Sequence, residues 1–269
     1  MIRVVLAGVT GWVGRALLPA ITAADDLKLV AAVSRKAAGR DAGEAIGVAP
    51  LGVTIAATMA EALATPSDVV VDYTKPDSVG RNTLEAIAAG RHVVIGASGL
   101  GADDYAAIDK AAREKNVGVL AAGNFSITAT LLKRFALEAA RYVADVEIID
   151  YASAGKSDTP SGTGRELAEA LSLVRAAATS KPVAQLGGIP GTRGAAVGSG
   201  PHGGVQVHAL RMPSFVVSVE AVFGADNERL VIRHDSGSSA APYVAGTLLA
   251  IRRVAEKPGL RRGLDTLMA

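Results

Sequence analysis

Three glycines near the start of the chain have the spacing of a phosphate-binding loop. Gly8, Gly11 and Gly14 lie in the segment GVTGWVG, directly after the apolar run Ile2–Leu6 and at the start of a segment with helical character. Glycine lets the backbone turn tightly and approach a pyrophosphate, whose charge is favoured by the amide groups of a helix N-terminus. The pattern predicts a dinucleotide-binding loop. Its expected cofactor contacts are Gly8, Thr10, Gly11, Trp12, Val13 and Gly14.

The end of the second expected strand indicates which nicotinamide cofactor this loop prefers. An NAD-specific site usually has an acidic residue there, which binds the ribose hydroxyls. This chain has Ser34, Arg35 and Lys36 instead, a hydroxyl followed by two cations suited to a 2′-phosphate. We therefore expect NADPH to be bound through Arg35 and Lys36, with NADH as a second candidate. Solvated loop charges are the alternative interpretation.

Three further segments with glycine or polar residues follow other expected strands. They are Asp72–Pro76, Gly96–Leu100 and Gly123–Ser126. Ligands bind at the carboxyl ends of strands in open α/β sheets, so three such segments favour a cofactor crevice over ordinary turns. The residues expected to contact the cofactor there are Tyr73, Thr74, Gly96, Ser98, Gly99, Gly123, Asn124 and Phe125.

A second cluster with anion-binding character lies in the middle of the chain. The segment Lys156–Thr163 reads KSDTPSGT and precedes an expected helix over Arg165–Ala178. Hydroxyls, free amides at a helix start and a lysine can together hold a carboxylate. We expect Lys156, Ser161, Gly162 and Thr163 to bind substrate, and the alternative is an ordinary helix cap beside an exposed lysine.

The elements that must position these segments follow two different patterns. Up to residue 123, short apolar runs alternate with alanine-rich helical segments, which is typical of βαβ units and a buried parallel sheet. Strands are expected at Ile2–Leu6, Leu27–Val33, Asp68–Asp72, His92–Ile95 and Val117–Ala121. From Val205 onward the strand runs Val205–Leu210, Phe215–Phe223 and Arg229–His234 are separated by turn residues and predict an antiparallel sheet.

The fold class is therefore α/β, a Rossmann-type doubly wound parallel sheet followed by an α+β domain. We expect residues 1–123 plus 237–269 to form the dinucleotide-binding domain, because the helical segment Ala240–Glu256 can return to pack on it. Residues 124–236 are expected to form the second domain. The glycine-rich segment Gly187–Gly204 is expected to be a mobile loop.

Composition excludes several function classes. The chain has 269 residues, no cysteine and four histidines without metal-binding spacing, so neither disulfides nor a metal site are expected. Its net charge of +2 is spread along the chain, which does not favour nucleic acid as a partner. No apolar run reaches the roughly 20 residues of a membrane span, and a cytoplasmic location is expected.

Six motifs in order resemble those of the dihydrodipicolinate reductase family. They are GVTGWVG near residue 8, DYTKP near 72, GASGL near 96, GNFS near 123, KSDTPSGT near 156 and RLVIRHDS near 229. The resemblance implies a Rossmann domain completed by the C-terminal helix and a substrate domain whose mixed sheet builds a homotetramer. It also implies hydride transfer from NAD(P)H to a cyclic, unsaturated dicarboxylate in diaminopimelate and lysine biosynthesis.

One departure from the family pattern affects the expected chemistry. The family motif E-x-H-H-x-x-K carries a proton-donating histidine and a second, substrate-contacting histidine, but this chain has Ala152 and Ser153 there and keeps only Lys156. Alanine cannot donate a proton and serine is a poor acid near neutral pH. Lys156 is our candidate for the catalytic acid, and Tyr151 or His202 are the alternatives.

These observations predict an NAD(P)H-dependent reductase of a C=N or conjugated C=C bond in a small cyclic carboxylate. The first candidate is a 4-hydroxy-tetrahydrodipicolinate reductase or a divergent homologue of it. A different imine reductase or amino-acid dehydrogenase on the same scaffold is the nearer alternative. The farther alternative is a non-catalytic NADPH-binding protein, which the loss of both histidines would permit.

Overall fold

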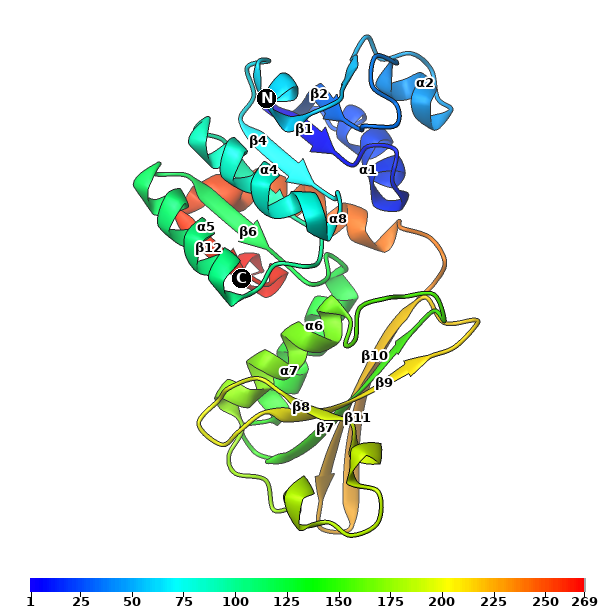
Figure 1. Cartoon of the computed structure of the whole chain (residues 1–269), viewed down its shortest axis with the longest axis vertical. Helices are drawn as coiled ribbons and strands as arrows, with labels where there is room; N and C mark the ends of the chain where they lie inside the picture. The colour runs from blue at the N-terminus through cyan, green and yellow to red at the C-terminus, as the bar shows by residue number, and fades with distance from the viewer. Residues whose placement is uncertain (269) are drawn as a thin grey trace. The chain divides into compact units, whose positions relative to one another are not determined.

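The computed structural model of the chain describes residues 1–268 and divides into two compact units (Figure 1). Unit 1 comprises Met1–Ile127 together with the segment from Ala240 onward, and unit 2 comprises Thr128–Ser239. Unit 1 is therefore built from both ends of the chain. Each unit has its own sheet and its own buried apolar core.

Unit 1 contains a seven-stranded sheet in the order β12-β6-β5-β4-β1-β2-β3, and all of its strand pairs are parallel. Its strands are β1 (Ile2–Ala7), β2 (Leu27–Val33), β3 (Ile55–Ala56), β4 (Val69–Asp72), β5 (His92–Ile95), β6 (Gly118–Ala121) and β12 (Gly259–Arg262). The central strands are buried on both faces, which is why their sequences are continuously apolar. The strand order reverses beside β1, and such a point is where open α/β sheets bind ligands.

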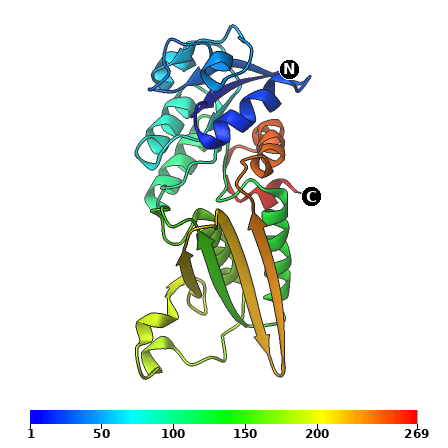
Figure 2. The same ribbon diagram turned by 90° about the vertical axis from the view of Figure 1, so that its right-hand side faces the viewer.

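Helices cover both faces of the unit 1 sheet (Figure 2). One core cluster joins the sheet to α1 (Trp12–Thr22) and α8 (Pro242–Arg253), and the other joins it to α3 (Met59–Leu63), α4 (Pro76–Ala88) and α5 (Ala102–Glu114). The short helix α2 (Ala42–Ile46) and the 3-10 turns η3 (Val254–Glu256) and η4 (Leu264–Leu267) complete the unit. This is the doubly wound α/β arrangement that the sequence predicts.

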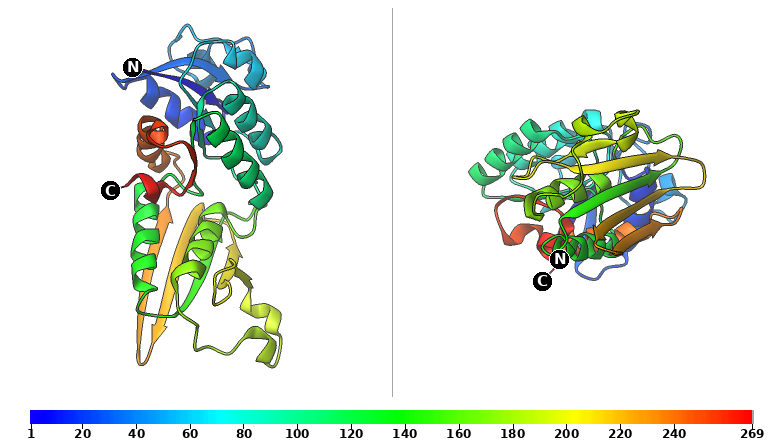
Figure 3. Two further views of the ribbon diagram at one scale, coloured as in Figure 1. Left: turned by 90° about the vertical axis from the view of Figure 1, so that its left-hand side faces the viewer. Right: turned by 90° about the horizontal axis from the view of Figure 1, so that it is seen from below.

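Unit 2 contains a five-stranded mixed sheet in the order β11-β10-β7-β9-β8. Its strands are β7 (Asp145–Ala152), β8 (Ala195–Val197), β9 (Val205–Arg211), β10 (Val217–Ala225) and β11 (Glu228–Ser236). Buried residues alternate along β7, so one face of that strand enters the core. Helices α6 (Ile127–Ala139) and α7 (Gly162–Val174) supply the other side of that core (Figure 3).

Three expectations about unit 2 need correction. The sheet is not purely antiparallel, because β7 and β9 pair in parallel. Gly187–Gly204 contains the 3-10 turn η2 (Pro190–Arg193) and the edge strand β8, and another 3-10 turn, η1 (Val183–Gln185), precedes it. Helix α7 also begins at Gly162 rather than Arg165, because Ser161 caps it. The pairings of β8 and β9 depend on hydrogen bonds to other strands, which local composition does not reveal, whereas the cap at Ser161 is a local hydrogen bond to Gly164.

Candidate functional site

The glycine loop after β1 has the geometry of a phosphate-binding cradle. Gly8 adopts a φ of +82°, and a Cβ atom there would lie 2.5 Å from the carbonyl oxygen of Tyr73. A Cβ atom at Gly14 would lie 2.2 Å from the carbonyl oxygen of Gly8, so only glycine lets α1 start this close to the loop. Gly11 is the N-cap of α1 and makes no side-chain cap hydrogen bond. The helix thus presents backbone amide groups and no acidic side chain in its first turn.

The loops after β4 and β5 pack directly against each other beside this cradle. A Cβ atom at Gly96 would lie 2.2 Å from the ring of Tyr73, and one at Gly99 would lie 2.3 Å from Pro76. The Tyr73 hydroxyl hydrogen-bonds Thr247 of α8 at 2.8 Å, and burial raises the pKa of Tyr73. Close packing by itself therefore explains why both positions are glycine. Ser98, between them, is exposed.

Asp72 anchors the loop after β4. The presence of an aspartate at this position does not by itself indicate that role. Its buried carboxylate accepts hydrogen bonds from the backbone and hydroxyl of Thr74 and from the amide of Asn82. Burial raises the pKa of this carboxyl, against the effect of those donors. The side chain of Thr74 is thus fixed by a residue at the end of its own strand.

The segment after β6 combines one core residue with two residues nearer the surface. Phe125 is 1% exposed, and its ring meets the ring of Tyr73 edge-on with centroids 5.8 Å apart. The side chain of Asn124 accepts a hydrogen bond from the amide of Ser126 at 2.8 Å, and Gly123 is exposed. The buried ring of Phe125 serves packing, so any cofactor contact from this residue would come from its backbone.

The cationic segment after β2 lies next to the glycine loop. The hydroxyls of Thr10 and Ser34 are 2.8 Å apart, which joins the two segments, and the side chains of Arg35 and Lys36 are exposed. Trp12 is half exposed and meets Tyr243 of α8 edge-on at 5.5 Å. The structure thus brings the predicted pyrophosphate and 2′-phosphate contacts to the same end of the sheet.

In unit 2, the start of α7 is built on a buried carboxylate. Asp150 of β7 is completely buried and accepts hydrogen bonds from the backbone amide and the hydroxyl of Ser161. The Ser161 oxygen in turn accepts the amide hydrogen of Gly164 at 3.2 Å. The predicted role of Ser161 therefore changes, because its only hydroxyl hydrogen is used within the protein and cannot be given to a substrate carboxylate. Gly162 and Thr163 form the first turn of α7.

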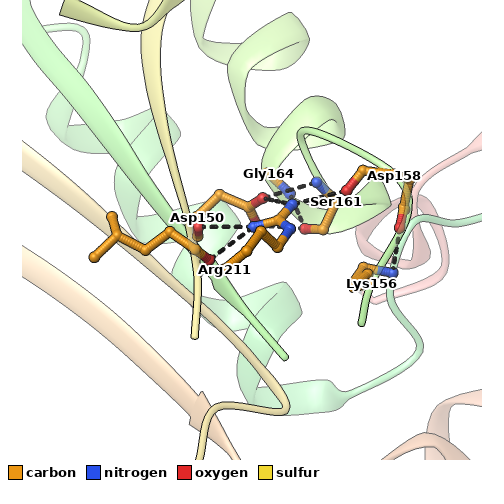
Figure 4. A network of polar contacts seen from close by, with 7 residues as sticks. Asp150, Lys156, Asp158, Ser161, Gly164 and Arg211 are labelled. Atoms are coloured by element: carbon orange, nitrogen blue, oxygen red, sulfur yellow. Dashed lines mark hydrogen bonds and ion pairs between the residues drawn. The ribbon is translucent and has the colours of Figure 1, made fainter. Parts of the chain in front are cut away.

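Lys156 lies in the loop between β7 and α7, in contact with a carboxylate (Figure 4). Its Nζ atom is 2.7 Å from Oδ1 of Asp158, while Oδ2 of Asp158 is buried without a hydrogen-bond partner. Arg211 of β9 donates to Asp150 and to the backbone oxygen of Asp158. No role was expected from the sequence for Asp150, Asp158 or Arg211, although Asp158 lies within the quoted segment KSDTPSGT.

The two positions at which the resemblance implied histidines differ in their surroundings. Ala152 is completely buried at the end of β7, in register with Arg211 and Val217, whereas Ser153 is exposed. Tyr151 points to the opposite face of β7 from Asp150, because side chains alternate along a strand. There it contacts Glu220 and Arg233, and burial, followed by the charge of Glu220, raises its pKa.

His202 lies at the wrong end of unit 2 to replace them within one chain. It precedes β9, beside the start of β7 at Asp145, whereas Lys156 follows the end of β7 at Ala152. The eight residues of β7 separate the two ends by roughly 23 Å, at about 3.3 Å for each of the seven steps between them. The remaining histidines are held within the protein. His92 accepts a hydrogen bond from the Gly118 amide, His208 contacts Glu147, and His234 is buried.

No helix within residues 1–268 is long and apolar enough to cross a membrane. The same residues contain no group of three or more His, Asp or Glu side chains that could hold a metal ion.

Comparison with known proteins identifies the family. The profile of dihydrodipicolinate reductase, N-terminus, matches residues 2–125, and that of dihydrodipicolinate reductase, C-terminus, matches residues 128–268. A 4-hydroxy-tetrahydrodipicolinate reductase from Synechococcus elongatus is 37% identical over 99% of this chain and 98% of its own. One from Syntrophomonas wolfei is 36% identical with the same coverage.

A solved structure agrees with this assignment. The dipicolinate-bound dihydrodipicolinate reductase from Paenisporosarcina sp. TG-14 superposes with a TM-score of 0.77 at 27% identity, over the full length of both chains. Sequence and fold therefore agree along the whole chain, which belongs to the dihydrodipicolinate reductase family.

Proposed function

We propose that this protein is an NADPH-preferring reductase of 4-hydroxy-tetrahydrodipicolinate or of a closely related cyclic imine carboxylate. The observation that carries the proposal is full-length similarity to reductases of that name, combined with a glycine cradle that has no room for side chains. Unit 1 would bind the dinucleotide, and unit 2 would bind the substrate and form the oligomer. A cytoplasmic homotetramer is part of the same proposal.

The residues of unit 1 fit a dinucleotide. The backbone amides at the start of α1 would bind the pyrophosphate, since neither a side-chain cap nor an acidic residue competes there. Tyr73, Thr74, Gly96, Ser98, Gly99, Gly123, Asn124 and Phe125 would border the nicotinamide half. When bound, the reduced nicotinamide supplies a hydride. The loops after β4 and β5 would hold the ring in place, because Tyr73 and Asp72 fix their conformation.

The preference for NADPH is supported by the exposed cations after β2. Arg35 and Lys36 lie beside the Thr10–Ser34 contact and have no carboxylate partner in the described chain. Asp77 is an acidic neighbour, and its pKa is held below the usual range by the Ser78 hydroxyl and then by Arg35. Two cations against this one neighbouring carboxylate leave a net positive site for a 2′-phosphate.

In unit 2 we propose that Lys156 and the first-turn amides of Gly162 and Thr163 bind a substrate carboxylate. Ser161 would contribute by fixing the start of α7 rather than through its hydroxyl. Lys156 would also donate the proton that completes the reduction, because Ala152 and Ser153 cannot. Neither Tyr151, on the opposite face of β7, nor His202, at its other end, is placed to do so.

The test is NADPH oxidation with 4-hydroxy-tetrahydrodipicolinate generated in situ, with NADH in parallel. We expect turnover with both cofactors and a higher kcat/KM with NADPH. Robust turnover of another cyclic imine with none of this substrate would instead support a different imine reductase or amino-acid dehydrogenase, which the loss of both family histidines favours as the second candidate. Tight cofactor binding without oxidation of NADPH by any imine would reveal a non-catalytic protein.

A further inference from the structure

Arg211 ties three separate parts of unit 2 together (Figure 4). It is the last residue of β9, and one guanidinium nitrogen donates to Oδ2 of Asp150 and to the backbone oxygen of Asp158, each at 2.8 Å. The other terminal nitrogen donates to the backbone oxygens of Asp150 and Leu210, at 3.2 and 2.9 Å. The guanidinium therefore fixes the substrate loop, which we define as residues 156–163, to two neighbouring strands.

The charges in this network alternate. The Asp150 side chain is completely buried and that of Arg211 is 16% exposed, so their attraction is little screened by water. Asp158 and Lys156 form a second ion pair, and both of its residues lie within the substrate loop. Asp150 also lies directly behind the start of α7, since it binds the amide and hydroxyl of the N-cap residue Ser161.

This position creates an electrostatic conflict that Arg211 resolves. A helix N-terminus favours anions because its amide groups carry partial positive charge. A bare carboxylate at the same place would cancel that effect and repel a substrate carboxylate. Arg211 neutralises Asp150 from the side of β9, so Asp150 can fix the N-cap without removing the positive potential of the helix start.

We propose that Arg211 is a positioning residue for substrate binding, which acts by neutralising Asp150 and by fixing the substrate loop. The inference rests on the proposed function in one respect, that the start of α7 receives the substrate carboxylate. Arginine suits the role better than lysine, because its planar fork reaches a carboxylate and several carbonyl groups at once.

The test uses dipicolinate as the probe and measures its Kd by calorimetry, alongside KM and kcat in the NADPH assay. Arg211→Met should weaken dipicolinate binding by about tenfold or more, the usual effect of losing charge-assisted hydrogen bonds. It should raise KM more than it lowers kcat, and leave the Kd of NADPH within about twofold. Unchanged dipicolinate binding would overturn the proposal.

A double variant separates the electrostatic role from simple loss of structure. Arg211→Met leaves a buried, uncompensated carboxylate, whereas Arg211→Met with Asp150→Asn removes both charges. The double variant should therefore bind dipicolinate better than the single variant, by about threefold or more. If it binds no better, neutralisation of Asp150 is not the cause. Arg211→Lys, which keeps the charge, should lose less affinity than Arg211→Met and remains informative if the others fold poorly.

Arg175→Met is the matched control. Arg175 is also buried in unit 2 and donates to backbone oxygens of residues 202–204, but it follows α7 and lies beside the start of β7. This variant should lose stability while keeping dipicolinate affinity within about twofold. An equal loss of affinity in Arg175→Met would mean that any damage to unit 2 has the same effect, which would overturn the proposal.

Hydrogen exchange distinguishes failure of this inference from failure of the proposed function. If the wild-type protein binds no dipicolinate and reduces no imine, the proposed function fails. Arg211 is then judged on the amides of Ser161 and Gly164, which are hydrogen-bonded in the cap. Faster exchange of these amides in Arg211→Met but not in Arg175→Met supports the positioning role, and equal exchange in the two variants excludes it.

Discussion

The two helix starts at the proposed binding regions are built in opposite ways. Helix α1 begins at Gly11 without a side-chain cap and without an acidic residue in its first turn. Helix α7 begins at Ser161, whose side chain is engaged on both sides, with the buried carboxylate of Asp150 directly behind it. The first is a cradle of backbone amides, and the second is a network of compensated side-chain charges.

The difference shows how each region would select its ligand. A backbone cradle recognises the shape and charge of a pyrophosphate, and its requirement is that nothing occupies the space, hence Gly8 and Gly14. A network of side-chain charges recognises its ligand through specific residues, so a single substitution can change its charge balance. This is consistent with a chain that has the glycines expected of the family at the first region and has Ala152 and Ser153 at the positions expected to carry histidines at the other.

Removing the lysine of the α7 region should have the largest effect. Lys156→Ala is expected to lower kcat by about 10²–10⁴, since it removes the proposed proton donor. The Kd of NADPH, for which we propose the α1 region, should not change. Lys181→Ala removes an exposed lysine of the same unit and should keep full activity. Full turnover in Lys156→Ala would remove this lysine from the catalytic role.

Adding one methyl group to each helix start sharpens the comparison. Gly14→Ala places a Cβ atom 2.2 Å from a backbone oxygen, so we expect loss of cofactor affinity by about 100-fold and lower stability. Gly164→Ala places it 3.1 Å from the Asp150 carboxylate, and we expect a rise in substrate KM of about tenfold or less. Gly80→Ala, with only ordinary contacts in α4, is the control. Fluorescence titration with NADPH and steady-state kinetics would measure both effects, and equal NADPH affinities in the first two variants would contradict the comparison.

Charge removal at the edge of the α1 region tests its cofactor preference. The double variant Arg35→Ala with Lys36→Ala should raise the Kd of NADPH by about tenfold and leave that of NADH within about twofold. The ratio of the two dissociation constants is the quantity to measure. A parallel loss for both cofactors would show that these cations do not contact a 2′-phosphate.

Introducing histidines at positions 152 and 153 should have the smallest effect on activity, and its effect on stability should differ between the two positions. Ala152 is completely buried, so Ala152→His is expected to lower the free energy of unfolding by about 1–3 kcal/mol through overpacking. Ser153 is exposed, and Ser153→His should change it by no more than about 0.5 kcal/mol. Urea unfolding measures both values. A stable Ala152→His variant with raised kcat would instead show that the site still has room for the histidine.

The parallel sheet was the most predictable part of the fold. The expected strands Leu27–Val33 and His92–Ile95 agree with β2 and β5 residue by residue, because their mainly apolar residues enter the buried core of the sheet, although Lys28 in β2 is exposed. The edge strands β3, β8 and β12 were not predicted. They are two to four residues long and have mixed composition, so their pairing with a longer neighbour, and not their own sequence, makes them strands.

The candidate site was predictable where its function resides in the backbone. Glycine spacing after a strand predicts a cradle because few residue types permit the turn, and the structure shows that side chains at Gly8 and Gly14 would collide with it. Side-chain roles were less predictable. Ser161 was expected to bind substrate with its hydroxyl, yet that group is used by Asp150, a residue eleven positions away.

Local patterns in the sequence were enough to predict the α/β class, the glycine cradle and the cations after β2, because each pattern consists of residues that are close together in the chain. The order of six such patterns along the chain was enough to indicate the family. The tertiary structure alone decided that Arg211 reaches Asp150 across 61 positions and that Tyr73 bonds Thr247 across 174. It also decided that His202 and Lys156 lie at opposite ends of β7. Such pairings follow from strand order and register, which are set by the packing of the whole sheet and not by any local pattern.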